Sequence, residues 1–345
     1  MQEAGNGFMI TQMKAVASIS TSKHAGKGVV PVKTLLISQP IHPKAMELLE
    51  GRYNILLPEM PGQQAFERLL PQADALILRT NVRLTKEALE SAPNLRMVAR
   101  LGVGLDNVPL KALKQRGIVL TWTPNANSVS VAEHTVAMLV ALAKYMPQYD
   151  KAVRTGGWDM RLLDLPVELY GKTVGIIGLG RIGKLVADIL HNGFKMHVIA
   201  YSPHINQREY PAYEATRSIE EVFQKSDFVC LCCPSNDATR GMVNASLLRM
   251  AKRGMILVNC SRGDIVVEPD LAAALEDGTL AAAGIDVFRE EPPAEDNPLR
   301  RLPNVLLSPH AAALTREASI RMATTAAEQV NAFFTNGMPD SVVEL

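Results

Sequence analysis

From residue 32 onward, short apolar runs alternate with stretches in which apolar residues recur every three or four positions. Apolar runs of about four to eight residues are typical of buried strands, and the second spacing is typical of helices. The first predicted strands are VKTLLIS (32–38), YNILLP (53–58), DALILR (74–79), LRMVARL (95–101) and IVLTW (118–122). The helices predicted between them are PKAMELLE (43–50), QQAFERLL (63–70), TKEALES (85–91) and LKALKQRG (110–117). This alternation predicts βαβ units and a parallel sheet.

A long, largely apolar stretch follows, SVSVAEHTVAMLVALAKYMPQYDKAVR (128–154). It predicts a single helix that begins at a cap formed by Ser128 or Ser130 and runs to about Arg154. Gly156 and Gly157 then provide the stop signal.

A second alternating series begins near residue 171. Its predicted strands are KTVGIIG (172–178), MHVIAYS (196–202), DFVCLCCP (227–234), GMILVNCS (254–261), TLAAAGIDVF (279–288) and NVLLSP (304–309). Its predicted helices are RIGKLVADILHN (181–192), SIEEVFQKS (218–226), NASLLRMA (244–251) and EPDLAAALEDG (268–278). About six strands is the number found in a dinucleotide-binding domain. A last helix is predicted within 315–337, and the first domain is one candidate surface for it.

Length, charge and cysteine content restrict the class of protein. A chain of 345 residues is long enough for about two domains, and a formal net charge of +1 argues against a general nucleic-acid binder. No apolar run reaches the roughly 20 residues that span a bilayer, and residues 1–31 do not resemble a secretory signal. We expect residues 1–31 to be a disordered tail; the alternative is an overlong predicted start of the chain. Three of the four cysteines crowd one apolar run, which indicates reduced thiols of a cytoplasmic protein and no metal site.

The stretch VGIIGLGRIG contains the pattern Gly-x-Gly-x-x-Gly at Gly178, Gly180 and Gly183. The pattern follows a predicted strand and opens a predicted helix, which is the context that a dinucleotide-binding loop requires. Such a loop brings backbone N–H groups and the positive end of a helix to a pyrophosphate. The alternative is a glycine-rich turn without a ligand.

The end of the next predicted strand, AYSPH, bears on the choice of cofactor. NAD-binding domains usually place an acid there to bind the ribose hydroxyls, but this chain has Ser202, followed by Pro203 and His204. A carboxylate would repel the 2′-phosphate of NADP, whereas a serine does not, and His204 or Arg208 offers a partner for it. The sequence therefore favours NADP; the alternative is an NAD enzyme with a neutral substitution at Ser202.

Three residues near predicted strand ends supply the groups that oxidation of a 2-hydroxy acid requires. His310 has the residue type for proton transfer, Arg262 is a cation for a carboxylate and a developing oxyanion, and Glu291 is an acid that tunes the histidine. Each residue alone has a plainer interpretation: a surface cation, a solvated loop acid and a histidine in a turn.

The chain resembles the D-isomer-specific 2-hydroxyacid dehydrogenases, a family that includes phosphoglycerate dehydrogenases, hydroxypyruvate and glyoxylate reductases and D-lactate dehydrogenases. The resemblance covers about residue 32 to the C-terminus. Four motifs carry it, in the family's order: ELYGKTVGIIGLGRIGKLVA (168–187), NCSRGDIVVEPDL (259–271), AGIDVFREEPP (283–293) and LSPHAAALT (307–315).

The resemblance implies roles for individual residues. Arg262 would bind substrate and take part in catalysis, His310 would be the acid/base, and Glu291 its partner. Substrate contacts would also come from Arg79, Val103 and Gly104, within LILRTN (76–81) and RLGVGLDNV (100–108). The implied cofactor contacts are Gly178, Gly180, Arg181, Ile182, Gly183, Ser202, Pro203, His204, Cys233, Pro234, Thr239, Cys260 and Asp286. Cys232 replaces a histidine that is common in the family, which leaves the local cofactor contacts open.

The resemblance further implies two Rossmann-like domains with parallel sheets and a cleft between them. Residues 32–128 and 316–345 would form a flavodoxin-like substrate domain, and residues 129–315 the dinucleotide-binding domain. The chain ends at Leu345, so we expect the short form without a C-terminal regulatory domain, and a homodimer through the cofactor domains.

The expected activity is NAD(P)-dependent interconversion of a small 2-oxo acid and its (R)-2-hydroxy acid. A substrate of the hydroxypyruvate or glyoxylate type is expected first. The alternatives are a D-3-phosphoglycerate dehydrogenase and a cofactor-sensing interaction protein like the family's transcriptional corepressor.

Overall fold

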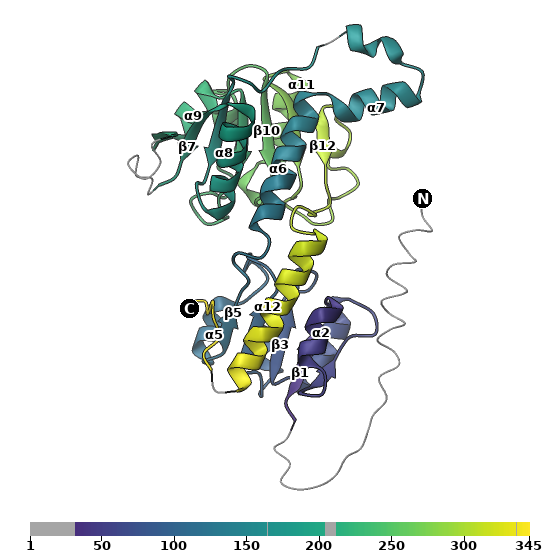
Figure 1. The fold of residues 1–345 in the computed structure, drawn as a ribbon, viewed down its shortest axis with the longest axis vertical. Coiled ribbons are helices and arrows are strands. Elements are labelled where there is room, and N and C mark those ends of the chain that lie inside the picture. Colours follow the sequence, from purple (N-terminus) through teal and green to yellow (C-terminus); the bar gives the residue numbers. More distant parts are fainter. Residues whose placement is uncertain (1–31, 164, 204–211, 336) are drawn as a thin grey trace.

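The computed structural model describes residues 32–163, 165–203, 212–335 and 337–345. The predicted tail 1–31 and the predicted cofactor residue His204 lie outside these ranges. The described chain forms two parallel β-sheets with helices packed on them, stacked along the longest axis of the molecule (Figure 1). This arrangement confirms the predicted α/β class with two domains.

The smaller sheet is built from the first five strands of the chain. They are β1 (Thr34–Ile37), β2 (Asn54–Leu56), β3 (Ala75–Leu78), β4 (Met97–Arg100) and β5 (Val119–Thr121), in the parallel order β2-β1-β3-β4-β5. The helices are α2 (Pro43–Leu49), α3 (Gln63–Leu69), α4 (Lys86–Glu90) and α5 (Leu110–Gln115), together with α12 (Arg316–Phe334) from the end of the chain. We call this unit the five-stranded domain. Its strand order is that of flavodoxin-like folds.

Helix α12 packs on the five-stranded domain although it follows the second sheet in sequence. Ala318, Met322, Ala326 and Val330 of α12 share one buried cluster with Leu35 and other residues of the small sheet. Small side chains on this face allow the helix to lie close to α2 and to strands β3 and β4. The chain therefore passes between the two domains twice, after β5 and again before α12 (Figure 1).

The larger sheet has seven strands. They are β6 (Thr173–Ile177), β7 (His197–Tyr201), β8 (Glu214–Thr216), β9 (Phe228–Leu231), β10 (Met255–Asn259), β11 (Leu280–Ile285) and β12 (Val305–Leu307). The helices of this seven-stranded domain are α6 (Ser128–Ala143), α7 (Met146–Arg154), α8 (Arg181–Phe194), α9 (Ile219–Lys225), α10 (Ala245–Leu248) and α11 (Glu268–Glu276). The parallel order β12-β11-β10-β9-β6-β7-β8 reverses direction between β6 and β9, as in a Rossmann domain.

The count of about six strands was wrong by one. Strand β8 has the sequence EAT and pairs with β7 at the edge of the sheet. It is short and mostly polar, so it produces no apolar run, and backbone pairing with β7 alone defines it.

The single helix predicted from Ser128 to Arg154 was also wrong. The structure has α6 and α7, bent by 58° at a break, and Tyr145 between them adopts a left-handed conformation with φ of 54°. Pro147 lies in the first turn of α7, where its missing N–H costs nothing. Neither serine caps α6: its N-cap residue is Asn127, which makes no side-chain capping bond.

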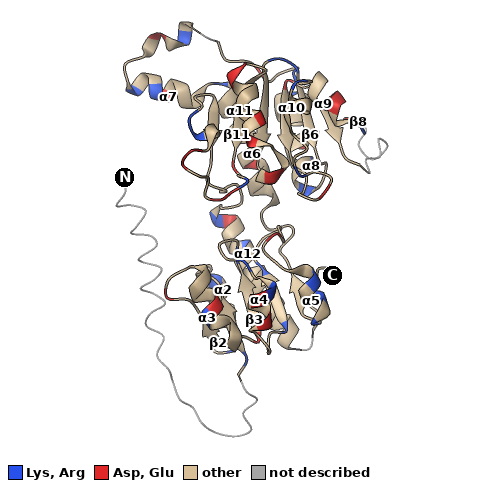
Figure 2. Cartoon of the chain, turned by 180° about the vertical axis from the view of Figure 1, so that it is seen from behind, with Lys and Arg blue, Asp and Glu red and all other residues tan. Residues whose placement is uncertain are grey.

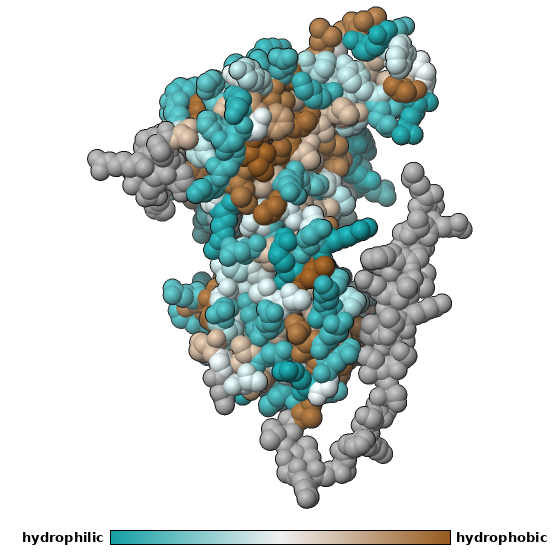
Figure 3. All heavy atoms as spheres, in the orientation of Figure 1, coloured by the Kyte–Doolittle hydropathy of each residue, from teal (hydrophilic) through white to brown (hydrophobic). Residues whose placement is uncertain are grey.

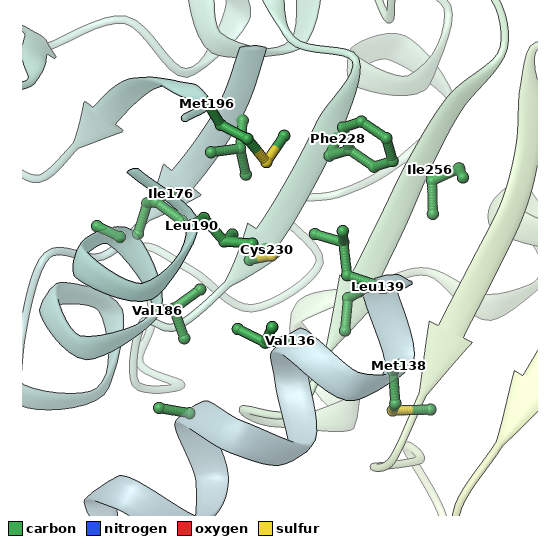
Figure 4. Packing of buried hydrophobic residues seen from close by; sticks show 14 of the residues in the cluster. Val136, Met138, Leu139, Ile176, Val186, Leu190, Met196, Phe228, Cys230 and Ile256 are labelled. Carbon is green, nitrogen blue, oxygen red and sulfur yellow. The ribbon is translucent and has the colours of Figure 1, made fainter. Parts of the chain in front are cut away.

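The two halves of that stretch have different surroundings. Val136 and Leu139 of α6 face Cys230 of β9 in the main cluster of the seven-stranded domain (Figure 4). Helix α7 has no buried residue and projects from the domain with the following turn (Figure 1).

No single helix in the described ranges is long and apolar enough to cross a membrane; only the bent pair of α6 and α7 passes that test of length and composition together.

Candidate active site

The glycine loop joins β6 to α8 at the point where the strand order of the larger sheet reverses. A Cβ on Gly178, whose φ is 97°, would lie 2.7 Å from the N atom of Cys233, and a Cβ on Gly183 would overlap the carbonyl of Gly178. No described residue lies within 4 Å of a Cβ on Gly180, so this side of the loop is open. The residues therefore fit a dinucleotide, because two glycines permit close packing and the third leaves space for a pyrophosphate.

The end of β7 lies beside this loop. The Gly178 N–H donates to the carbonyl oxygen of Tyr201 at 2.8 Å, and Ser202 follows directly. Ser202 is half-buried and Pro203 is exposed. A hydroxyl thus stands at the strand end where an acid usually meets the ribose.

Arg181, the first residue of α8, reaches the other domain. Its guanidinium carbon lies 5.4 Å from the ring centroid of Trp122, which follows β5 of the five-stranded domain. Cation–π contacts of this kind are typical of arginine over tryptophan. The side chain of the first residue of α8 is therefore in contact with the five-stranded domain.

His310 and Glu291 form a pair at the carboxyl edge of the larger sheet. His310 Nδ1 lies 2.7 Å from Glu291 Oε2, and the N–H of Phe288 donates to Glu291 Oε1 at 3.1 Å. Partial burial alone would raise the pKa of the Glu291 carboxyl, but the hydrogen bonds from His310 and Phe288 outweigh it and leave that pKa below its usual value. Because Nδ1 is occupied, Nε2 is the atom of His310 that remains for a ligand.

Asp286, at the end of β11, fixes the loop that carries His310. The carbonyl oxygen of Asp286 accepts from the His310 N–H at 2.8 Å, and its buried carboxylate accepts from the N–H groups of Ala311 and Ala312 at 2.8 and 3.0 Å. His310 itself has a φ of 51°, a left-handed conformation that is uncommon outside glycine. The three bonds to Asp286 hold His310 in this conformation.

Arg262, after β10, crosses to the five-stranded domain. Its Nε donates to Asp106 Oδ2 at 2.8 Å and its Nη1 donates to the Ser261 carbonyl at 2.6 Å. A Cβ on Gly104 would overlap Arg262 Nη2, so the guanidinium lies directly on the backbone of residue 104. The structure thus brings Arg262 to the segment that contains Val103 and Gly104.

The segment at 102–104 is positioned by Thr123. The Gly102 N–H donates to Thr123 Oγ1 at 2.9 Å, and the Thr123 N–H donates to the Gly102 carbonyl at 3.1 Å. Within the described part of the chain, the N–H groups of Val103 and Gly104 make no hydrogen bond. These two N–H groups are therefore the ones available to a carboxylate.

Two further arginines lie in the same region. Arg79 is half-buried and donates from Nη1 to the Pro40 carbonyl at 2.8 Å. Arg100 is buried; it donates to the Leu101 carbonyl, and from Nε to Asn107 Oδ1 at 3.2 Å. Burial lowers the pKa of Arg100 to about 10, with further lowering from the charges of Arg262 and Arg79 and opposition from Asp106. The electrostatic balance of this region is thus positive.

The remaining predicted cofactor residues line the loops around the glycine turn. Cys233 is buried against Gly178, the Pro234 carbonyl accepts from Thr239 Oγ1 at 2.7 Å, and Ile182 packs on the main cluster. The buried Cys260 thiol faces the Met138 sulfur at 3.8 Å, and burial raises the pKa of the Cys260 thiol to about 12. Such thiols are protonated at neutral pH and act as packing groups.

Three residues of this region were absent from the candidates drawn from the sequence: Asp106, Trp122 and His134. His134 Nε2 lies 3.6 Å from Asp286 Oδ1, and these two residues with Cys260 place one ligand-type atom each within 4.8 Å. Asp106 was detectable, because it stands in the same glycine-rich turn as Val103 and Gly104. Trp122 and His134 could not be identified as site residues from the sequence, because the pattern predicts only a strand end at Trp122 and a buried helix at His134.

The fold and this site define a two-domain α/β protein whose larger domain has the features of a dinucleotide-binding domain. Residues 136–312 match the family model described as D-isomer specific 2-hydroxyacid dehydrogenase, NAD binding domain. The chain belongs to the D-isomer specific 2-hydroxyacid dehydrogenase family.

Individual relatives agree with this assignment. A glyoxylate reductase of Aeropyrum pernix is 37% identical over 321 residues, which cover 90% of this chain and 95% of that protein. A D-3-phosphoglycerate dehydrogenase of Methanocaldococcus jannaschii is 35% identical over 90% of this chain, but the match spans only 59% of that relative's length. A D-lactate dehydrogenase of Aquifex aeolicus, solved with NAD and lactic acid, superposes with a TM-score of 0.79 at 28% identity, covering 88% of this chain and 96% of that one.

Proposed function

We propose that the protein is an NAD(P)-dependent oxidoreductase that interconverts a small 2-oxo acid and its (R)-2-hydroxy acid. The observation that carries the proposal is the 2.7 Å contact between His310 and Glu291 at the sheet edge from which Arg262 also emerges. A proton donor with a carboxylate partner, beside a cation for the substrate, is the set that this chemistry requires.

Each residue has a distinct task in the reducing direction. A nicotinamide dinucleotide held by the glycine loop would supply the hydride for the keto carbon. His310 gives a proton from Nε2 to the carbonyl oxygen, while Glu291 holds Nδ1 and compensates the positive charge of the protonated ring. Arg262 stabilises the negative charge that develops on the oxygen and orients the substrate carboxylate. The N–H groups of Val103 and Gly104 bind the other side of that carboxylate.

A small unphosphorylated substrate, of the glyoxylate or hydroxypyruvate type, suits the site best. Arg79 and Arg100 could receive a phosphate group, but part of their donors already bind carbonyls and Asn107. The relative matched along almost its whole length is named a glyoxylate reductase, whereas the phosphoglycerate dehydrogenase is matched over part of its length. D-3-phosphoglycerate is the second candidate because Arg100 lies close enough to Arg262 and to Arg79 for both charges to lower its pKa.

We further propose a preference for NADP. Ser202 stands where a carboxylate would repel the 2′-phosphate, and His204 follows it in the sequence. Ser202→Asp should raise KM for NADPH about tenfold or more and leave KM for NADH within about threefold. A wild-type protein that strongly prefers NADH would contradict this preference.

The projecting arm, residues 145–163, supports a homodimer. Six apolar residues on and beside it are more than half exposed: Met146, Val153, Trp158, Leu162, Leu163 and Leu165. Figure 3 shows apolar surface on this arm. A groove of about 440 Å³ lies between the arm and β12, lined by Leu142, Met160 and Leu306 among others. Apolar surface of this extent is typical of an interface, and we propose a second copy of the chain as its partner.

Light scattering tests the dimer: the wild type should have twice the mass of the chain, and Leu162→Asp with Leu163→Asp should have the mass of one chain. A wild-type monomer would contradict the proposal.

We place the protein in the cytoplasm because its four cysteines are free.

The proposed reaction is tested with a panel of 2-oxo acids, each offered with NADH and with NADPH, by following the absorbance of the reduced nicotinamide. Glyoxylate or hydroxypyruvate should be reduced at the highest kcat/KM, and His310→Ala should lower the rate of reduction by about 100-fold or more. Turnover of no 2-oxo acid with either cofactor would overturn the proposal.

A further inference from the structure

The ion pair between Arg262 and Asp106 joins residues of different domains. The two residues are 156 positions apart, and Arg262 Nε lies 2.8 Å from Asp106 Oδ2. Arg262 is the residue that we propose for the substrate carboxylate, so a carboxylate of the chain itself is bound to it here. The inference below rests on that proposed role of Arg262.

Asp106 is presented from a fixed backbone. The neighbouring Asn107 donates from Nδ2 to the carbonyls of Arg79 and Val82 at 2.9 and 2.8 Å and accepts from Arg100 through Oδ1. The Asp106 side chain, in contrast, is 58% exposed. Its carboxylate is therefore free to rotate into water while its backbone stays in place.

The guanidinium offers a carboxylate two edges, and each edge has one donor engaged. Nη1 donates to the carbonyl of the adjacent Ser261, a backbone group that cannot leave without moving the chain. Nε donates to Asp106, and Nη2 lies against Gly104, where we place the substrate. A substrate carboxylate that takes the edge formed by Nε and Nη2 must replace the Asp106 carboxylate.

We propose that Asp106 is an internal competitor for the substrate carboxylate, occupying Arg262 until a 2-oxo acid displaces it. When no substrate is bound, the Asp106 carboxylate neutralises Arg262, so the half-buried Arg79 and the buried Arg100 do not face a third unpaired cation. When substrate binds, one carboxylate replaces another on the same guanidinium. Every carboxylate ligand must break the ion pair between Asp106 and Arg262, and the free energy of that ion pair lowers the apparent affinity for the ligand. Asp106 therefore sets KM without touching the reacting atoms.

A purely positioning role for Asp106 predicts the opposite change in carboxylate affinity when Asp106 is removed. If Asp106 only held Arg262 in a productive orientation, its removal would release the guanidinium and weaken carboxylate binding. Competition predicts that removal strengthens binding, because the donor is then vacant. The direction of the change thus separates the two roles.

The probe is oxalate, a dicarboxylate that is not reduced, titrated calorimetrically into the full-length protein. Asp106→Asn should bind oxalate about fivefold more tightly than the wild type, the value expected for loss of a partly exposed competing ion pair. Asp106→Glu, which keeps a carboxylate, should stay within about twofold of the wild type. Asp237→Asn, a fully exposed site with the same charge change in the other domain, is the matched control and should also match the wild type.

Equal or weaker oxalate binding by Asp106→Asn would overturn the inference, as would an equal gain in Asp237→Asn. The proposed reaction is measured separately by turnover of 2-oxo acids. Tighter oxalate binding in a protein that reduces no 2-oxo acid would leave the competition intact and remove the proposed function. Turnover of a 2-oxo acid by the wild type, together with unchanged oxalate binding by Asp106→Asn, would support the proposed function and overturn the competition.

Discussion

The glycine loop and the Arg262 site differ in how the chain holds them. The backbone of the glycine loop lies within one domain, and its conformation is fixed by backbone packing, since a Cβ on Gly183 would overlap the Gly178 carbonyl. The Arg262 site joins two domains, and a Cβ on Gly104 would meet the guanidinium of an arginine side chain. A site within one domain is set by the fold, whereas a site between domains also depends on side chains that can exchange partners.

Loss of the proton donor should have the largest effect and should leave both regions intact. His310→Ala should lower kcat by about 100-fold or more, because general acid–base catalysis contributes at least that factor. The Kd for the cofactor and the melting temperature should change little. Near-normal turnover would remove His310 from the reaction.

Two glycine substitutions separate packing from cofactor approach within the loop. Gly183→Ala should lower the free energy of unfolding by about 1–3 kcal/mol, because the new methyl group meets a backbone carbonyl. Gly180→Ala meets no described atom within 4 Å and should keep nearly all of the stability, yet raise the cofactor Kd about tenfold by blocking the pyrophosphate. Denaturant unfolding and cofactor titration measure the two quantities. Equal effects of both substitutions would show that the loop does not approach a phosphate.

The substitution Gly104→Ala tests the Arg262 site between the domains. Its methyl group would push Arg262 away, so kcat/KM should fall about tenfold while stability and cofactor Kd stay near the wild-type values. Steady-state kinetics with a saturating cofactor measure the change. A large loss of stability in this variant would mean that residue 104 is held by backbone packing, like Gly183.

The smallest effect concerns the dependence of stability on pH. The pKa of Glu291 is lowered in the folded protein, so its contribution to stability is present above the unfolded carboxyl pKa of about 4.3 and is lost as the pH falls through the lower folded value. Glu291→Gln should therefore have a lower melting temperature than the wild type at neutral pH, and the difference should vanish in acid. A difference that persists unchanged at low pH would rule out a charged pair.

The sequence predicted the parts of the molecule that depend on local patterns. Apolar runs located the main strands, and Gly178 and Gly183 identified the loop because their spacing follows from packing that is local in the chain. Strand β8 was not predicted because pairing at the edge of a sheet needs no apolar run. The break at Tyr145 was not predicted because α6 and α7 share a continuous helical spacing. The contacts of Asp106 with Arg262 and of Trp122 with Arg181 could not be predicted, although Asp106 stands in a candidate turn, because each contact joins residues far apart in the sequence.

The central claim is that His310 and Arg262 act together on a 2-oxo acid beside a bound nicotinamide. The most direct measurement is reduction of glyoxylate and hydroxypyruvate by cofactor that carries deuterium at C4, followed by isotope and chirality analysis of the product. We expect deuterium at C2, the (R) configuration for the hydroxypyruvate product, and about 100-fold or more slower product formation with His310→Ala. Product without deuterium, product of the (S) configuration, or undiminished product with His310→Ala would contradict it.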